Sequence, residues 1–311
     1  MLLLALGFDA WIGDPAWLWK RLPHPVVLFG ALIDRAERWG NDPVLPANVK
    51  RRNGWIAITV LIAAAVGAGI VLVLSLRITG PIGLLLEAMI VGVFLAQRSL
   101  HEHVAAVAVA MRKSGLAGGR RAVAMIVGRD PERLGETGVC RAAIESLAEN
   151  FADGIVAPAF WYAVAGLPGL LAYKMANTAD SMIGHLTDRH RDFGRGAAKL
   201  DDLLNLFPAR LTSVLLGIAT LGRTQTILAR TRTDAPRHRS PNAGWPEAAM
   251  AYAIDIALGG PRSYGEGMLS EPVLNASGRS TATAADIDRA LAVYTRACMV
   301  LSVLVAVAVL L

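Results

Sequence analysis

Residues 55 to 76 read WIAITVLIAAAVGAGIVLVLSL, an apolar run without a charged side chain. A helix needs about 20 such residues to cross the hydrocarbon core of a bilayer, so this run predicts a membrane-spanning helix. Residues 292–311 have the same character, provided that Arg296 extends its side chain to the interface. Residues 80–98 are nearly as apolar and are the third firm span that we predict.

The span at 80–98 contains one acidic residue, Glu87. An ionisable group at membrane depth usually has a function, because burying its charge in lipid is costly. Alternatively, Glu87 lies near the headgroups and pairs with Arg77. The sequence leaves both interpretations open.

The overall composition also indicates a membrane protein. Of 311 residues, 54% are apolar and only 18% are charged, which is too apolar for an ordinary globular domain. The net charge of +6 favours contact with anionic headgroups or phosphorylated ligands. No basic patch is paired with an aromatic stacking platform, so nucleic acid is not a predicted partner. Cys140 and Cys298 are isolated, which excludes a disulfide framework, a zinc ribbon and a CxxC pair.

Two further apolar stretches, 154–173 and 203–221, are interrupted by residues such as Gly166, Pro168 and Pro208. Interrupted helices at membrane depth usually line a cavity. The polar loops 101–153, 174–202 and 223–290 are all rich in Arg and Lys, so simple alternation of spans would place one of them outside. We therefore expect at least one interrupted stretch to be re-entrant.

The polar segments are predicted to be helical as well. Asp130 can cap a helix that begins at Pro131 and continues to about Phe151. No alternating strand pattern of useful length occurs. The sequence thus predicts an all-α, polytopic helical membrane protein, a single domain over residues 1–311 with interrupted or re-entrant helices and amphipathic cytoplasmic helices.

The densest polar segment, ESLAENFADG at 145–154, places Glu145, Glu149 and Asp153 at i, i+4 and i+8. On a helix these carboxylates share one face and repel one another, which implies a cationic partner. Hard oxygen ligands near a phosphate-bearing substrate favour Mg²⁺. A solvated helix face is the alternative, but the segment continues directly into an apolar stretch.

A second polar segment, YKMANTADSMIGH at 173–185, places Asn177 and Asp180 where they could complete a Mg²⁺ shell. His185 has a side chain whose unperturbed pKa suits proton transfer near neutrality. A lone histidine is more often structural. We nevertheless predict that His185 is the base, and that Glu149 and Asp180 are catalytic carboxylates.

Charged residues follow this segment closely. Arg and Lys side chains can grip phosphate oxygens, and those predicted to do so are Lys174, Arg189, Arg191 and Arg195. Asp201 lies four residues before Asn205 and is a further predicted metal ligand. His24 and Asn242 lie in Pro- and Gly-rich elements that are either helix-capping turns or substrate-binding loops.

Several of these motifs, taken in order, resemble those of one family. They are GDP and HP around Asp14 and His24, GRD at 128–130, the two long segments above, DDLLNLFPARL at 201–211 and SPNAGWPEAAMAYAI at 240–254. From Asp9 to about Gly267, the chain resembles the CobD/CbiB membrane proteins of cobalamin biosynthesis, the adenosylcobinamide-phosphate synthases. No nucleotide-binding loop of the common kinds is present.

The resemblance implies a ligase that forms an amide bond between adenosylcobyric acid and aminopropanol phosphate, or a similar amino alcohol, to give adenosylcobinamide phosphate. It implies ATP as co-substrate, Mg²⁺ and a corrinoid substrate. It also implies an integral inner-membrane protein whose active face is cytoplasmic, surrounded by lipid and associated with other late cobalamin-pathway membrane enzymes.

Two other functions remain open at this point. One is a non-catalytic corrinoid-binding or signalling membrane protein, similar to AmpE, in which the acidic faces serve helix packing. The other is a transporter, which Glu87 and the interrupted stretches would favour.

Overall fold

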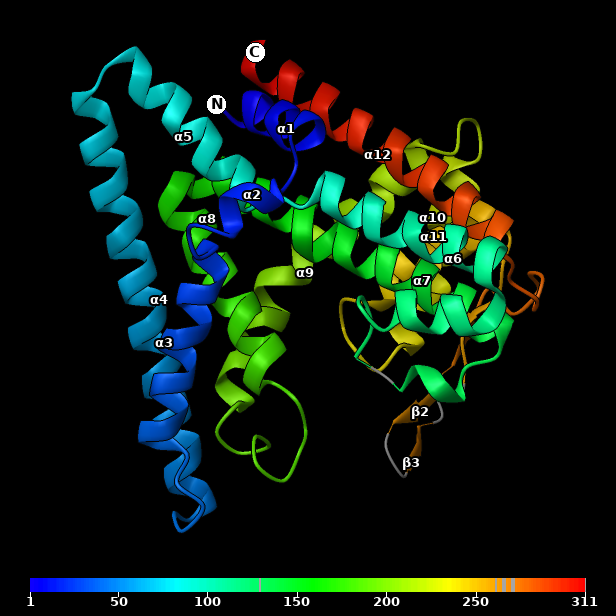
Figure 1. Ribbon diagram of the computed structural model, residues 1–311, viewed down its shortest axis with the longest axis horizontal. Coiled ribbons are helices and arrows are strands. Elements are labelled where there is room, and N and C mark those ends of the chain that lie inside the picture. Colours follow the sequence, from blue (N-terminus) through cyan, green and yellow to red (C-terminus); the bar gives the residue numbers. More distant parts are fainter. Residues whose placement is uncertain (129, 261, 265–266, 270–271, 311) are drawn as a thin grey trace. The chain divides into compact units, whose positions relative to one another are not determined.

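The computed structural model of the chain describes residues 1–128, 130–260, 262–264, 267–269 and 272–310 and is mainly helical (Figure 1). Arg129 of the GRD element lies outside these residues. Among the described residues, four helical segments are long and apolar enough to cross a membrane: Ala47–Ile78, Pro81–Val123, Glu136–Ile183 and Ala284–Leu310. The prediction of an all-α polytopic membrane protein is confirmed. The contacts divide the chain into one unit of residues 1–95 and 157–205, and another of residues 96–156 and 206–311.

Unit 1 is built around two long helices, α4 and α8, which pack along each other. Helix α3 packs on both, and α1 packs on α5 (Figure 1). Gly69 allows the close approach of α4 to α8, because a Cβ atom there would lie 2.6 Å from Pro168 Cα. The helices are α1 Leu2–Trp11, α2 Ala16–Trp19, α3 Pro25–Gly40, α4 Ala47–Ile78, α5 Pro81–Val93, α8 Ala157–Ile183 and the first part of α9 Arg195–Ile218.

Helix α8 is broken inside the stretch 154–173. Gly166 has φ 62° and ψ −153°, a conformation that side chains other than glycine rarely adopt. Pro168 follows in the first turn of the second segment, where a missing backbone N–H is tolerated. The interruption expected from the sequence is therefore a sharp kink at Gly166.

The acidic residue of α5 has a partner within unit 1. Tyr162 on α8 donates its hydroxyl hydrogen to Glu87 Oε1 at 2.7 Å, and both residues are half-buried. A hydrogen bond to the carboxylate lowers the cost of keeping it away from water. The partner that the structure gives Glu87 is thus Tyr162 and not Arg77, and a function for Glu87 stays a prediction.

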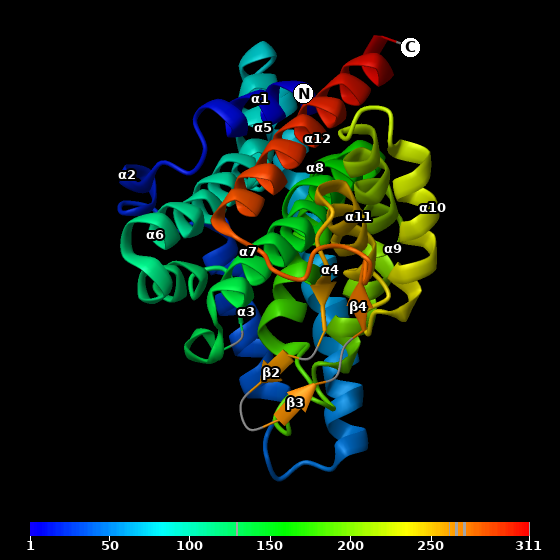
Figure 2. The same ribbon diagram turned by 90° about the vertical axis from the view of Figure 1, so that its right-hand side faces the viewer.

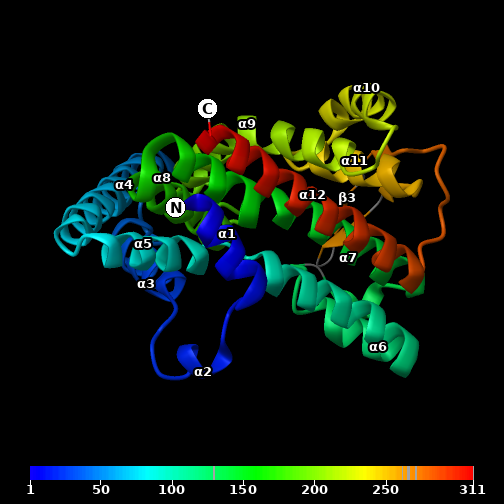
Figure 3. The same cartoon turned by 90° about the horizontal axis from the view of Figure 1, so that it is seen from above.

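Unit 2 contains three helices, α6, α7 and α12, each of which packs against the other two (Figure 3). Helix α11 packs on α7 and α12, and α10 packs on α11 (Figure 2). The rings of Phe151 and Tyr294 pack edge to face in the core, with their centroids 5.1 Å apart. The bounds are α6 Gln97–Val123, α7 Glu136–Phe151, a π-helical turn Ala152–Val156, α10 Thr224–Asp234, α11 Gly244–Ile254 and α12 Ala284–Leu310.

Short elements complete unit 2. The helix predicted from Pro131 is a single 3-10 turn, Pro131–Arg133, and α7 begins only at Glu136 because Leu134 and Gly135 are extended. Helix α7 ends at Phe151, as the sequence predicted. A second 3-10 turn covers Ala235–Arg237, and two small antiparallel pairs join β1 Leu258–Gly259 to β4 Val273–Leu274 and β2 Arg262–Tyr264 to β3 Gly267–Leu269.

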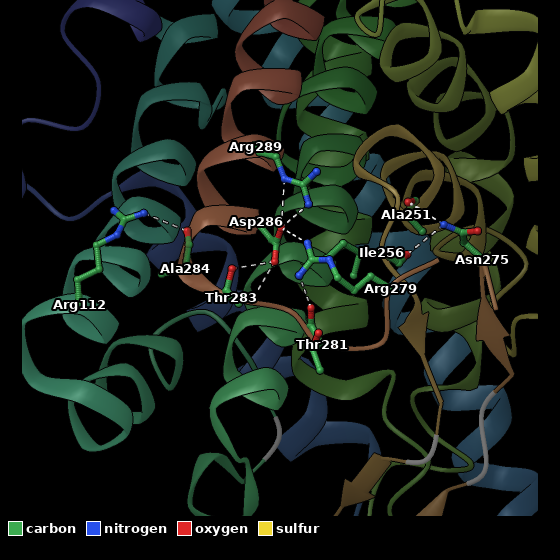
Figure 4. Close-up of polar contacts among 10 residues, drawn as sticks. All are labelled: Arg112, Ala251, Ile256, Asn275, Arg279, Thr281, Thr283, Ala284, Asp286 and Arg289. Atoms are coloured by element: carbon green, nitrogen blue, oxygen red, sulfur yellow. Dashed lines mark hydrogen bonds and ion pairs between the residues drawn. The ribbon is translucent and has the colours of Figure 1, made fainter. Parts of the chain in front are cut away.

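The segment before α12 is fixed by buried polar contacts (Figure 4). Asp286 accepts hydrogen bonds from the Thr283 backbone N–H at 2.8 Å and from the Thr283 hydroxyl at 2.9 Å, which caps the helix. Arg279 and Arg289 also donate to Asp286. Asn275 donates to the carbonyl oxygens of Ala251 and Ile256, which ties this segment to the end of α11.

A buried carboxylate, Asp234, makes the stability of unit 2 depend on pH. It accepts hydrogen bonds from Tyr252 at 2.7 Å, from the Asn275 backbone at 2.8 Å and from Arg237 at 3.2 Å. Burial alone would raise the pKa of Asp234, but these contacts lower it below its ordinary value. The stabilisation is therefore present above the unfolded-state pKa and is lost as pH falls through the folded-state pKa.

We expect Asp234→Asn to cost about 2 kcal/mol at pH 7, which lowers the thermal midpoint in detergent by roughly 4–8 °C. The difference from the parent protein should shrink as pH falls below the unfolded-state pKa of about 4, and it should vanish below the lower folded-state pKa, where Asp234 is protonated in both states. Asp288→Asn is the control, since Asp288 is half-exposed and pairs with a half-exposed Arg112. A deficit that grows on acidification would contradict the prediction.

Candidate functional site

A chain of polar side chains joins α8 to α9 within unit 1. Tyr173 donates its hydroxyl hydrogen to Asn205 Oδ1 at 3.0 Å, and Asn205 Nδ2 donates to Asp201 Oδ2 at 3.0 Å. Asn177 Nδ2 donates to Asp201 Oδ1 at 3.3 Å. Asp201 is only 8% exposed and Asn205 only 1%. The structure thus brings together two motifs that the sequence showed separately, at 173–185 and 201–211.

The electrostatics of this cluster favour a cation. Burial raises the pKa of Asp201 to about 7, and the nearby carboxylate of Asp180 contributes to the increase, while hydrogen bonds from Asn177 and Asn205 oppose it. Two neighbouring carboxylates in a poorly hydrated place repel each other unless a positive charge lies between them. The oxygen donors of Asn177, Asp180 and Asp201 suit Mg²⁺, which prefers carboxylate and amide oxygens.

The N-terminal elements also belong to unit 1. His24 caps α3, because its Nδ1 accepts a hydrogen bond from the Val26 backbone at 3.2 Å. Its Nε2 lies 4.0 Å from Asp14 Oδ1. The pKa of His24 is lowered, chiefly by burial, and the charge of Asp14 opposes this shift. The charge of half-buried Lys174 lowers it further, so Lys174 lies in the neighbourhood of His24. The capping role left open by the sequence is therefore present.

The other predicted phosphate-binding residues lie in the loop between α8 and α9 or just after it. Arg189 Nε donates to Glu37 Oε1 at 2.7 Å. Arg191 Nη2 is 4.0 Å from Asp188 Oδ1 and is exposed. Arg195, the first residue of α9, and His185, directly after Gly184, are exposed. The proposed base is thus accessible to a substrate.

The remaining predicted residues lie in unit 2. Glu145 is buried, and its Oε1 accepts a hydrogen bond from the Gly259 backbone at 2.8 Å, so one of its oxygens holds β1 against α7. Glu149 is exposed, and Asp153 lies in the π-helical turn, which shifts the helical phase. Asn242 is buried, and its backbone N–H donates to Ser240 Oγ at 3.2 Å. The parts of the chain that the structure describes contain no group of three His, Cys, Asp or Glu side chains placed to hold a metal.

Sequence patterns did not indicate two members of the polar environment. In the sequence Tyr173 is only the first residue of a motif, whereas in the structure its hydroxyl donates a hydrogen bond to Asn205. Glu37 belongs to none of the sequence motifs, although it accepts hydrogen bonds from Arg189 and His190. The sequence could not reveal its contact with the loop, because Arg189 and His190 lie 152 and 153 residues away along the chain.

Comparison with known proteins agrees with the motifs. Residues 2–294 match the model of the CobD/Cbib protein family. The chain is 57% identical over 300 residues to the cobalamin biosynthesis protein CobD of Brucella anthropi, covering 94% of this chain and 91% of that one. It is 53% identical to the CobD of Sinorhizobium fredii, covering 100% and 96% of the two chains. It is 48% identical to that of Rhodobacter capsulatus, covering 96% and 93%.

No solved structure matches the chain. The family model covers almost the whole length, and it includes both polar motifs whose side chains meet between α8 and α9. The chain therefore belongs to the CobD/CbiB family of cobalamin biosynthesis proteins.

Proposed function

We propose that the protein is an ATP- and Mg²⁺-dependent ligase that joins adenosylcobyric acid to aminopropanol phosphate, or a similar amino alcohol, and forms adenosylcobinamide phosphate. The observation that carries the proposal is the buried cluster of Asn177, Asp201 and Asn205 beside Asp180. This oxygen-rich donor set suits a Mg²⁺–phosphate complex better than it suits helix packing. Membership of a cobalamin biosynthesis family supports the corrinoid as substrate.

A carboxylate does not form an amide unaided, because its oxygen is a poor leaving group. The propionate carboxylate attacks the γ-phosphorus of ATP, an O–P bond forms, the bond from that phosphorus to the β,γ-bridging oxygen breaks, and ADP leaves the acyl phosphate. The amine then attacks the acyl carbon, a C–N bond forms, the C–O bond to phosphate breaks, and inorganic phosphate leaves. Mg²⁺, when bound, would act as Lewis acid and template for the phosphate oxygens.

The chain supplies the remaining functions. Asn177, Asp180 and Asp201 would hold the metal, and Glu145, Glu149 and Asp153 of unit 2 remain predicted ligands. Lys174, Arg189, Arg191 and Arg195 would neutralise the anionic oxygens. His24 and Asn242 remain predicted substrate contacts. The attacking amine must lose a proton, and exposed His185 or a carboxylate without metal would accept it.

The protein is proposed to reside in the inner membrane with its active face toward the cytoplasm. Four candidate spans make lipid its surroundings. Substrates that carry phosphate or several carboxamides are polar, so the site must open to water rather than to hydrocarbon. Other late cobalamin-pathway membrane enzymes are proposed partners.

The purified protein in detergent, supplied with adenosylcobyric acid, aminopropanol phosphate, ATP and Mg²⁺, is expected to yield a corrinoid with the mass of the amide. ATP consumption should match amide formed, and EDTA should abolish both, with recovery on added Mg²⁺. Corrinoid binding without a change in mass would favour the AmpE-like binder. Flux across sealed vesicles with unchanged corrinoid would favour a transporter.

A further inference from the structure

Glu37, on α3, is a buried carboxylate that holds a distant loop. Its side chain is only 9% exposed. Its Oε1 atom accepts hydrogen bonds from Arg189 Nε at 2.7 Å, His190 Nε2 at 2.8 Å and Asn41 Nδ2 at 3.3 Å. Because a carboxylate oxygen only accepts, the His190 proton must be on Nε2. One acid thus fixes two consecutive residues of the loop.

Further contacts hold the same loop, residues 184–194, which we call the anchored loop. Asn41 Nδ2 donates to the Arg189 carbonyl at 3.0 Å, and Arg51 Nε donates to Asp192 Oδ1 at 2.7 Å. Buried Phe193 fits against two glycines of α3 and α4. A Cβ atom on Gly40 would lie 2.8 Å from its ring, and one on Gly54 would lie 2.0 Å from its carbonyl oxygen.

The hydrogen bonds to Glu37 also set its charge. Burial alone would raise the pKa of Glu37, but the hydrogen bonds from Arg189, His190 and Asn41 lower it below its ordinary value, so the carboxylate is ionised at neutral pH. Without it, His190, whose side chain is only 17% exposed, would lose its acceptor where little water can replace it, and the exposed Arg189 would lose its ion pair. Of the contacts described, the anchored loop would then be held only by those of Asn41, Arg51 and Phe193.

We propose that Glu37 is a positioning residue: it fixes the anchored loop so that exposed Arg191 and Arg195 are held ready to bind the phosphate of the amine substrate. This proposal rests on the ligase function proposed above. Arg191 lies within the anchored loop, and Arg195 directly follows it at the start of α9. Neither arginine contacts Glu37 in the hydrogen bonds and ion pairs described, so Glu37 acts on them through the backbone.

Steady-state kinetics test the proposal with three variants. Glu37→Ala is expected to raise the KM for aminopropanol phosphate about tenfold or more, because misplaced binding groups lose much of their effect, and to change kcat less than threefold. Glu37→Gln keeps a neutral acceptor and should be intermediate. Asp34→Ala removes an exposed acid one turn earlier on α3 and should match the parent. Equal KM values for all four proteins would overturn the proposal.

A second measurement does not depend on catalysis. Trypsin cleavage after Arg189, Arg191 or Arg195 of the full-length protein in detergent should be about tenfold faster for Glu37→Ala than for the parent and Asp34→Ala, since a released loop opens more often. If Glu37→Ala fails to fold, Glu37→Gln takes its place. It should then show a higher KM for aminopropanol phosphate and faster trypsin cleavage than the parent.

The outcomes separate the two proposals. Unchanged cleavage would overturn the anchoring by Glu37, whatever the reaction. Faster cleavage with an unchanged KM would show that Glu37 anchors the loop, but it would overturn the claim that the anchored loop positions Arg191 and Arg195 to bind the substrate phosphate. Absence of any amide product from the parent protein would overturn the ligase function, and phosphate binding by the loop with it, while the cleavage rates would still decide whether Glu37 anchors the loop.

Discussion

Asp201→Asn is expected to lower turnover about a thousandfold, equivalent to roughly 4 kcal/mol of transition-state stabilisation. Asp201 accepts hydrogen bonds from Asn177 on one oxygen and from Asn205 on the other. An asparagine would turn an NH₂ group toward one of these donors and would remove the negative charge that a metal ion requires. Asp180→Asn should have an effect of similar size.

The control is Asp202→Asn, the same substitution at the next residue of α9. Asp202 is half-buried, burial raises its pKa, and the hydrogen bonds described between Tyr173, Asn205, Asn177 and Asp201 are made by other side chains. We expect it to retain activity within about tenfold of the parent. Rates are measured as amide product by mass spectrometry, with membrane insertion and corrinoid binding compared in parallel. Parental turnover in Asp201→Asn would contradict the assigned role.

Gly194→Ala is expected to have the largest effect on stability. A Cβ atom on Gly194 would lie 1.6 Å from the Ile183 carbonyl oxygen, where no flexible side chain can move aside. The backbone at the end of α8 and before α9 would have to separate, at a cost of about 3 kcal/mol or more. The thermal midpoint and the yield of folded protein in the membrane should both fall sharply.

Gly67→Ala is the matched control for that substitution. Gly67 lies in α4, and a Cβ atom there would meet nothing within 4 Å. Alanine has the better helix propensity, by about 1 kcal/mol, so this variant should be as stable as the parent or slightly more so. If Gly194→Ala and Gly67→Ala had equal thermal midpoints, Gly194 could not lie as close to the Ile183 carbonyl oxygen as the structure places it.

The long apolar runs were predictable because lipid imposes a local rule, a length of apolar helix. Helices α4 and α12 follow directly from it. Gly166 and Pro168 also gave a local signal, and the structure has its kink there. The start of α7 was missed, because Pro131 begins only a 3-10 turn and the chain is extended again at Gly135.

The candidate site was predictable in its residue types but not in its pairings. Asn177, Asp180 and Asp201 stood out because amide and carboxylate side chains are unusual beside apolar stretches. Which of them meet depends on the packing of α8 against α9, which no spacing in the sequence specifies. Glu145 shows the same limit, since its hydrogen bond to Gly259 spans 114 residues.

The central claim is that Asp180, Asp201 and Asn177 hold a divalent ion against phosphate. It is tested most directly with Mn²⁺ in place of Mg²⁺, by electron–nuclear double resonance of the protein with ATP and corrinoid bound. We predict phosphorus hyperfine coupling to the protein-bound Mn²⁺ in the parent and in Asp202→Asn, and its loss in Asp180→Asn and Asp201→Asn. The same coupling in all four proteins, or no protein-bound Mn²⁺ in the parent, would contradict the claim.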